Sequence, residues 1–230
     1  MNVRPDQLAD ILDTQLHPVY VIAGDEPLQV MEAADRVRAR CRQLDFADRE
    51  VFDVDVGFDW QRFQDQADSL SLFASRRILD LRMPSAKPGR EGAQVLSAYT
   101  ARIPQDTVLL MTAGRLDAAQ KKSAWFKALD RVGVVTQCWA IPPERLPAWL
   151  QQRFLSRGMR ASKEVVDYVA HRVEGNLLAA AQEIDKLALL VGAGSVDIDA
   201  VREAVADSSR FDVFELADSA LAGDCQRAIR

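Results

Sequence analysis

Along the first 140 residues, short apolar runs alternate with amphipathic stretches. The apolar runs predict strands, because a strand covered on both faces carries mostly apolar side chains. The stretches between them repeat apolar side chains every three or four positions, as a helix with one buried face does. Such apolar runs predict strands over residues 18–23, 77–82, 107–112 and 133–137, and alternation of apolar and polar residues predicts a half-buried strand over residues 50–56. The predicted helices cover residues 5–16, 59–68, 92–103 and 118–129, and a long helix follows Pro27.

This alternation also predicts how the strands are connected. Strands separated by helices of this length favour crossover connections and a mainly parallel sheet, so we expect an α/β domain with flanking helices over residues 1–140. Three prolines within residues 140–147 indicate a domain edge. Beyond them we expect no strand and a small all-helical domain over residues 141–210. The helical patterns there cover residues 146–156, 162–173, 177–191 and 199–206, and another covers residues 213–222.

The last residues of the chain predict the start of a further helix. Gly223 and Asp224 are typical of a helix end followed by a new N-cap. The helix that would start there has only residues 225–230, too few to pack as a domain. We therefore expect this chain to be a fragment that lacks most of a further helical domain.

The composition is that of a folded globular protein. The 230 residues are 48% hydrophobic and 27% charged, with 29 basic and 34 acidic side chains and a net charge of −5. Residues 1–140 hold 18 basic and 20 acidic side chains, and the rest hold 11 and 14. Because neither part is basic, a large surface for nucleic-acid phosphates is disfavoured. A DNA-binding adaptor stays open only as an alternative.

The cysteines and histidines indicate neither a disulfide framework nor a metal site. The three cysteines (Cys41, Cys138 and Cys225) are far apart, and the only histidines are His17 and His171. This usage favours a reducing, cytoplasmic location. No run of 18 uncharged apolar residues occurs, so we expect no membrane span.

The turn after the first predicted strand is where an α/β domain of this kind would bind a nucleotide. In this sequence the turn reads Gly24, Asp25, Glu26, Pro27. It has one glycine, no lysine and no hydroxyl, its two carboxylates repel phosphate, and proline offers no N–H. No acidic pair for Mg²⁺ follows residues 107–112. We therefore expect an empty nucleotide site, no cofactor, no metal and no catalytic residue; an active ATPase is the alternative.

A second candidate site lies between the predicted helix 59–68 and the third predicted strand. The segment runs from Ser69 through Leu70, Ser71 and Leu72 to Phe73. Large apolar side chains in a connection otherwise rich in serine and alanine either cap the core or bind a partner. Burying Leu72 and Phe73 in a partner's pocket would contribute about 1.5–3 kcal/mol each before entropic costs.

Four stretches together resemble the delta-subunit family of bacterial DNA polymerase III: residues 20–28, 71–76, 124–129 and 174–182. The resemblance implies a degenerate AAA+ architecture, with a RecA-like α/β domain, a helical lid and a C-terminal helical collar. The collar would begin near Phe211 and be largely absent from this chain. Members of this family neither bind nor hydrolyse ATP. The phosphate-sensing arginine of active AAA+ lids has no counterpart in residues 175–178.

The same resemblance implies a function and partners. Such a subunit is a non-catalytic clamp loader component of the DNA-directed DNA polymerase (nucleotidyltransferase) holoenzyme that binds the beta sliding clamp and opens its ring during replication. The matching clamp-binding residues are Leu72 and Phe73 as principal anchors, with Leu70, Ser69 and Ser71 beside them; the general motif prefers Gln where this chain has Ser69. The other implied partners are the gamma/tau and delta prime subunits, through the collar, and primed DNA within the assembled loader.

Overall fold

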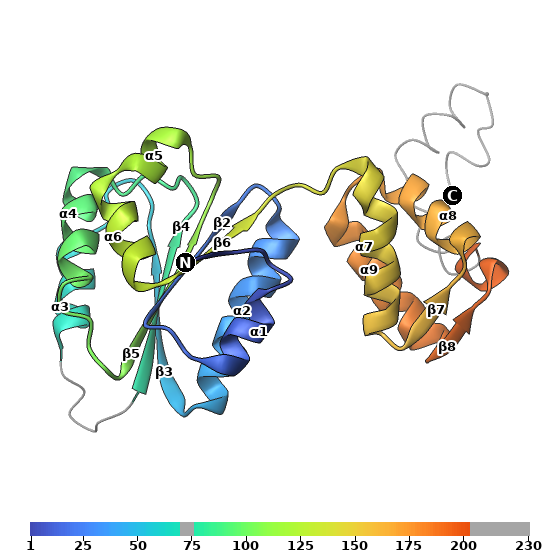
Figure 1. Cartoon of the computed structure of the whole chain (residues 1–230), viewed down its shortest axis with the longest axis horizontal. Coiled ribbons are helices and arrows are strands. Elements are labelled where there is room, and N and C mark those ends of the chain that lie inside the picture. Colours follow the sequence, from blue (N-terminus) through green and yellow to red (C-terminus); the bar gives the residue numbers. More distant parts are fainter. Residues whose placement is uncertain (70–75, 203–230) are drawn as a thin grey trace, which may run out of the picture. The chain divides into compact units, whose positions relative to one another are not determined.

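The computed structural model describes residues 1–69 and 76–202 of the chain. The chain divides into two compact units, the first comprising Met1–Ala140 and the second starting at Ile141 (Figure 1). The helix expected over residues 213–222 and the boundary expected after residue 210 lie outside the described residues.

The first unit is built on a six-stranded sheet in the order β1-β6-β2-β5-β4-β3. All of its pairings are parallel, so the predicted α/β class is confirmed. The strands are β1 (Asn2–Val3), β2 (Val19–Gly24), β3 (Phe46–Asp53), β4 (Arg76–Met83), β5 (Thr107–Ala113) and β6 (Val134–Cys138). The sequence pattern missed β1, because two residues cannot establish a period.

Helices cover both faces of this sheet (Figure 1). They are α1 (Leu8–Thr14), α2 (Pro27–Gln43), α3 (Trp60–Asp68), α4 (Gly89–Tyr99), α5 (Ala118–Lys122) and α6 (Ala124–Val132). Side chains of α1 and α2 form one buried cluster with the sheet, and side chains of α3, α4 and α6 form the other. The crossover connections of a parallel sheet require this three-layer arrangement.

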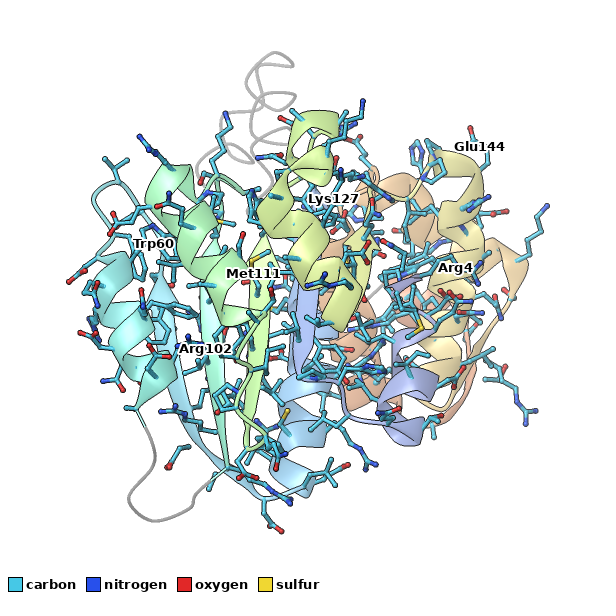
Figure 2. All side chains as sticks on the ribbon, turned by 60° about the vertical axis from the view of Figure 1, so that its left-hand side comes forward. Arg4, Trp60, Arg102, Met111, Lys127 and Glu144 are labelled. Carbon is cyan, nitrogen blue, oxygen red and sulfur yellow. The ribbon has the colours of Figure 1, made fainter. Side chains whose placement is uncertain are left out.

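Strand β2 is apolar because both of its faces are buried. In β2, Val19 and Val21 face the α3, α4 and α6 layer, whereas Tyr20 and Ile22 face α1 and α2. All four are 0% exposed. Figure 2 shows Met111 of β5 among the side chains of the same interior. Successive strand residues point to opposite faces, so a continuous apolar run was the correct signal for these strands.

Several element boundaries of the first unit differ from the prediction. The helix predicted over residues 92–103 covers Gly89–Tyr99, and the one predicted over residues 5–16 covers Leu8–Thr14. The strand predicted over residues 50–56 begins earlier, at Phe46, and ends at Asp53. The alternation was extended too far because Val56, although apolar, is fully exposed in the turn beyond the strand. The helix predicted over residues 118–129 is two helices, since Ser123 ends α5 and its hydroxyl accepts a hydrogen bond from the N–H of Phe126 at the start of α6.

The second unit is mainly helical, but the expectation that it has no strand was wrong. After a 3₁₀ turn (Pro143–Arg145), its elements are α7 (Leu146–Ser156), β7 (Met159–Ala161), α8 (Lys163–Val173), α9 (Leu177–Val191) and β8 (Gly194–Val196), with further helical residues at 198–202. β7 and β8 form a two-stranded parallel sheet. Strands of three residues are too short for an alternating pattern to reveal.

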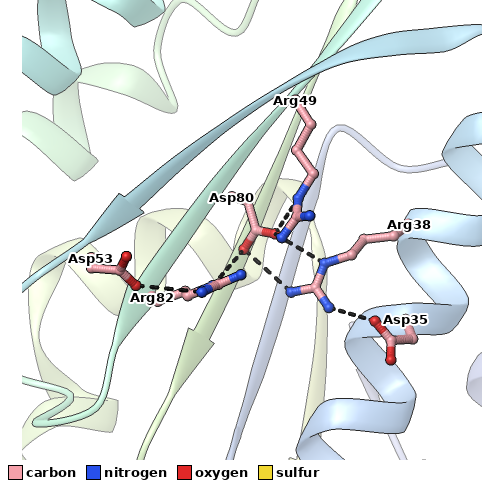
Figure 3. Close-up of polar contacts among 6 residues, drawn as sticks. All are labelled: Asp35, Arg38, Arg49, Asp53, Asp80 and Arg82. Atoms are coloured by element: carbon pink, nitrogen blue, oxygen red, sulfur yellow. Dashed lines mark hydrogen bonds and ion pairs between the residues drawn. The ribbon is translucent and has the colours of Figure 1, made fainter.

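One charged side chain lies inside the sheet of the first unit. Asp80 of β4 is 0% exposed, and its carboxylate is surrounded by three arginines (Figure 3). The guanidinium of Arg38 from α2 donates to it at 2.9 Å, and that of Arg49 from β3 lies 2.7 Å away. Arg82 lies 3.8 Å from the same carboxylate.

The ion pairs of Asp80 link three elements of the first unit. Asp80 connects edge strand β3 and helix α2 to the interior strand β4. Arg38 also lies 2.7 Å from the carboxylate of Asp35, and Arg82 lies 3.6 Å from that of Asp53. These two carboxylates compensate part of the positive charge around Asp80. Removal of one member of a buried charge group leaves its partners desolvated and unpaired, which costs far more than an exposed ion pair contributes.

Replacement of Asp80 therefore tests the packing of this end of the sheet. We expect Asp80→Asn to lower the free energy of unfolding by about 3 kcal/mol, because three arginines lose their central counter-charge. The matched control is Asp53→Asn, whose exposed carboxylate binds only Arg82, with an expected loss below about 1 kcal/mol. Urea unfolding followed by circular dichroism measures both. Equal losses in the two variants would contradict this account.

Candidate functional site

The end of β2 lies unusually close to the end of β6. Gly24 pairs with Cys138 in the parallel register of these strands. A Cβ atom at position 24 would lie 1.8 Å from the carbonyl oxygen of Cys138, a distance that no side chain can occupy. Glycine is therefore required here to let the two backbones approach, and not to admit a phosphate group.

The close approach determines where the backbone N–H groups of the following turn point. The N–H groups of Asp25 and Glu26 both donate to the carbonyl oxygen of Cys138, at 3.1 and 3.3 Å. The N–H of Leu28 donates to the carboxylate of Glu26 at 3.3 Å, and Pro27 has no N–H. A phosphate-binding loop directs such groups at its ligand. In this turn they are bonded within the chain.

The two carboxylates of the turn also disfavour phosphate binding. Glu26 is 9% exposed and serves as the N-cap of α2. Its pKa is raised, mainly by burial; the N–H of Leu28 opposes this, and the Asp25 carboxylate adds to it. Asp25 accepts a hydrogen bond from the N–H of Ala140 at 3.2 Å and lies 3.4 Å from the Arg115 guanidinium. Both carboxylates are thus fixed at the helix N-terminus, where a nucleotide phosphate would have to bind.

A tryptophan occupies the same edge of the sheet. Trp139 follows β6 and is 39% exposed. The Arg115 guanidinium lies 5.3 Å and the Lys121 ammonium 4.9 Å from the centre of its ring. The side chain of Gln29 donates to the carbonyl oxygen of Trp139 at 2.9 Å. The sequence pattern could not assemble this group, because its members come from four separate segments.

The predicted clamp-binding segment begins at the end of α3. Ser69 is the C-cap of this helix: its N–H donates to the carbonyl oxygen of Asp65 at 2.9 Å, and its hydroxyl donates to that of Gln66 at 3.0 Å. Leu70, Ser71, Leu72 and Phe73 lie outside the described residues. Their role therefore stays a prediction.

The second unit contains the stretch in which an active lid would carry its arginine. Glu174 ends α8 in the left-handed region, at φ 46°, and Gly175 follows at φ 85°. Asn176 is the N-cap of α9, and its side chain accepts a hydrogen bond from the N–H of Ala179 at 3.0 Å. The residues of this turn thus serve to start a helix.

Metal-binding clusters and cysteine thiols were the other candidate chemistry among the described residues. No group of three or more metal-binding side chains occurs among them. The thiols of Cys41 and Cys138 are buried, and burial raises their pKa to about 11 and about 12. Both are therefore protonated near neutral pH and poor nucleophiles. None of the helices described is both long and apolar enough to cross a membrane.

Two structural features of these sites escaped the sequence analysis. The first is the carbonyl oxygen of Cys138, which no side-chain pattern can reveal. The second is Arg77, the second residue of β4, whose guanidinium binds the end of α3. The pair Arg76-Arg77 directly before an apolar strand was its only signal in the sequence.

Comparison with known proteins identifies related chains. A family model for the DNA polymerase III delta subunit matches residues 20–139. The chain is 31% identical to DNA polymerase III subunit delta of Escherichia coli over 229 residues, and 28% identical to that of Haemophilus influenzae over 235 residues. Each alignment covers 100% of this chain and 67% of the relative.

Solved structures resemble the fold. The Bacillus subtilis DNA clamp loader delta protein (YqeN) matches with a TM-score of 0.70 at 20% identity, over 98% of this chain and 69% of that one. The Thermotoga maritima RuvB Holliday junction branch migration motor matches with a TM-score of 0.52 at 11% identity, over 92% of this chain and 73% of that one. The fold is thus AAA+-like, as the family resemblance implied. With more than half of its residues matched by the family model, the chain belongs to the DNA polymerase III delta subunit family.

Proposed function

We propose that this chain is a clamp-loader subunit without nucleotide chemistry of its own, which binds the beta sliding clamp and opens its ring for loading onto primed DNA. Membership of the delta subunit family supports the clamp-loader role. The observation that carries the non-catalytic part is the turn after β2, whose N–H groups bind Cys138 and Glu26. A phosphate would have to break these bonds and approach two carboxylates.

Ring opening without nucleotide hydrolysis requires differential binding. A subunit that fits an opened clamp better than a closed one shifts the clamp towards the open form, by as much as its two affinities differ. The proposed contact is the segment from Ser69 to Phe73, with Leu72 and Phe73 as the apolar anchors. Two such side chains in one pocket of the clamp can act as a hot spot.

The remaining partners are proposed on the family's architecture. The collar expected from residue 211 onward, together with any further C-terminal residues, would join the gamma/tau and delta prime subunits. Primed DNA would be contacted only within the assembled loader, since neither part of this chain carries excess positive charge. The cytoplasmic location indicated by the cysteines remains a prediction.

Substitution of the two anchors tests the proposed contact with the clamp. We expect Leu72→Ala/Phe73→Ala to weaken binding to the sliding clamp of the same organism by at least about 100-fold, because two buried apolar side chains are lost. Surface plasmon resonance on immobilised clamp measures the affinity. The control is Val56→Ala, which truncates a fully exposed apolar side chain and should leave the affinity unchanged. Undiminished binding by the double variant would refute the proposed contact.

The second prediction concerns nucleotide. Titration of the chain with ATP or ADP and Mg²⁺ to millimolar concentration should give no saturable heat in isothermal calorimetry, because the phosphate position is blocked by bonded N–H groups and acidic side chains. Clamp binding by the same sample shows that it is folded. A saturable nucleotide isotherm would instead favour the alternative of an active ATPase.

A further inference from the structure

Helices α3 and α4 enclose a groove along the halves that lead to their C-terminal ends. Its cavity volume is about 340 Å³, and all the residues that line it belong to the first unit. The apolar wall comes from Phe63 and Ala67 of α3 and from Val95 and Ala98 of α4. A groove of this size can hold a small organic molecule.

Tyr99, the last residue of α4, also lines this groove. Its ring packs beside that of Phe63, with the ring centres 6.1 Å apart, and the residue is only 7% exposed. Its hydroxyl oxygen is buried and has no hydrogen-bond partner among the residues that the structure describes. Buried hydroxyl groups nearly always have a partner, because an unpaired one has lost its bonds to water without compensation. A ligand in the groove would supply the missing bond.

The Tyr99 hydroxyl can act as a donor at neutral pH. Burial raises the pKa of Tyr99, although the guanidinium of Arg77 opposes this effect. The hydroxyl is thus protonated, and the bond that it lacks is one to an acceptor such as a carboxylate or carbonyl oxygen.

The guanidinium of Arg102 is the second polar group of the groove that lacks a partner. The N–H of Arg102 donates to the carbonyl oxygen of Tyr99 at 3.1 Å, so the turn after α4 holds this residue beside the groove (Figure 2). Within the described part of the chain, no carboxylate pairs with its side chain. A guanidinium binds a carboxylate through two parallel N–H donors, which fixes the orientation of the ligand as well as its charge.

The charges around the groove limit the kind of anion that it accepts. Arg102 is the one cationic side chain among the lining residues described, and Asp68 at the end of α3 lines the same groove. A phosphate or another multiply charged anion would meet one positive and one negative side chain, whose effects largely cancel. A single carboxylate needs only the guanidinium of Arg102, while an apolar body attached to it covers the wall of the groove.

We propose that this groove is a binding site for a small monocarboxylate with an apolar body. Arg102 pairs with the carboxylate, the Tyr99 hydroxyl donates a hydrogen bond to the ligand, and the walls from α3 and α4 cover the apolar part. The inference goes beyond the clamp-loader function and does not depend on it, because none of these residues belongs to the segment proposed to bind the clamp.

The test is a titration of the chain with phenylacetate, followed by the amide signals in two-dimensional NMR. We expect saturable shifts centred on Tyr99 and Arg102, with a dissociation constant in the millimolar range. Phenethylamine, which carries an ammonium group on a similar body, should bind at least about tenfold more weakly. Tyr99→Phe should weaken phenylacetate binding about fivefold, and Arg102→Gln at least about tenfold. The matched control is Arg90→Gln, at the other end of α4 and outside this groove, with less than about twofold change.

Two further measurements separate a binding site from a structural role. Because the Tyr99 hydroxyl has no partner within the described chain, Tyr99→Phe should leave the thermal midpoint unchanged or raise it. Ala98→Leu narrows the groove and keeps both polar groups, so it should abolish phenylacetate binding in a folded chain.

Four results would each overturn the proposal. They are the absence of saturable shifts with phenylacetate, tighter binding of phenethylamine, an equal loss of affinity in Arg90→Gln and Arg102→Gln, and a clear fall of the thermal midpoint in Tyr99→Phe. The last result would show that the hydroxyl stabilises the fold through a bond within the chain. Clamp affinity does not enter any of these measurements, so their failure leaves the proposed function untouched.

Discussion

The carbonyl oxygen of Cys138 determines whether the backbone N–H groups after β2 can bind a ligand at the carboxyl edge of this sheet. It accepts hydrogen bonds from the N–H groups of Asp25 and Glu26, at 3.1 and 3.3 Å, and it leaves no room for a Cβ atom at Gly24. In a nucleotide-binding sheet, the same backbone groups would face phosphate oxygens. Here they tie the start of α2 to the end of β6, so the turn has a structural role.

The parallel order of the strands separates this turn from the proposed clamp contact. Gly24 lies at the carboxyl end of β2, whereas Ser69 precedes the amino end of β4. Because all the strands of the sheet run in one direction, the two positions lie at opposite edges. The turn after β2 and the start of the proposed clamp contact therefore lie at opposite ends of the sheet, and Arg77 binds Ser69 at the second of them.

Much of the fold was predictable because its strands are buried on both faces. Buried positions are apolar, so burial can be read from the sequence pattern. It explains the apolar runs of β2 and β5 and the helical period of α2 and α9. The strands β1, β7 and β8 have two or three residues, and no period can be read from so few. The break at Ser123 was missed because a serine within a helical pattern is ambiguous until its hydroxyl is seen to cap α6.

The candidate sites were predictable to a lesser degree. The missing lysine and hydroxyl after Gly24 were visible as residue types, and the prediction of an empty nucleotide site rests on them. The reason the turn is closed was not visible, because it depends on a backbone carbonyl 114 positions away in the sequence. The hydrogen bonds of Arg77 could not be predicted either, because their acceptors Thr107 and Ser69 belong to different elements.

The most direct measurement is amide hydrogen exchange at Asp25 and Glu26, with and without millimolar ATP and Mg²⁺. The bonds to Cys138 predict that both amides are protected in the free chain and that nucleotide leaves their exchange rates unchanged. Rapid exchange of these amides in the free chain, followed by protection when ATP is added, would contradict the account, because the turn would then have open N–H groups that bind phosphate.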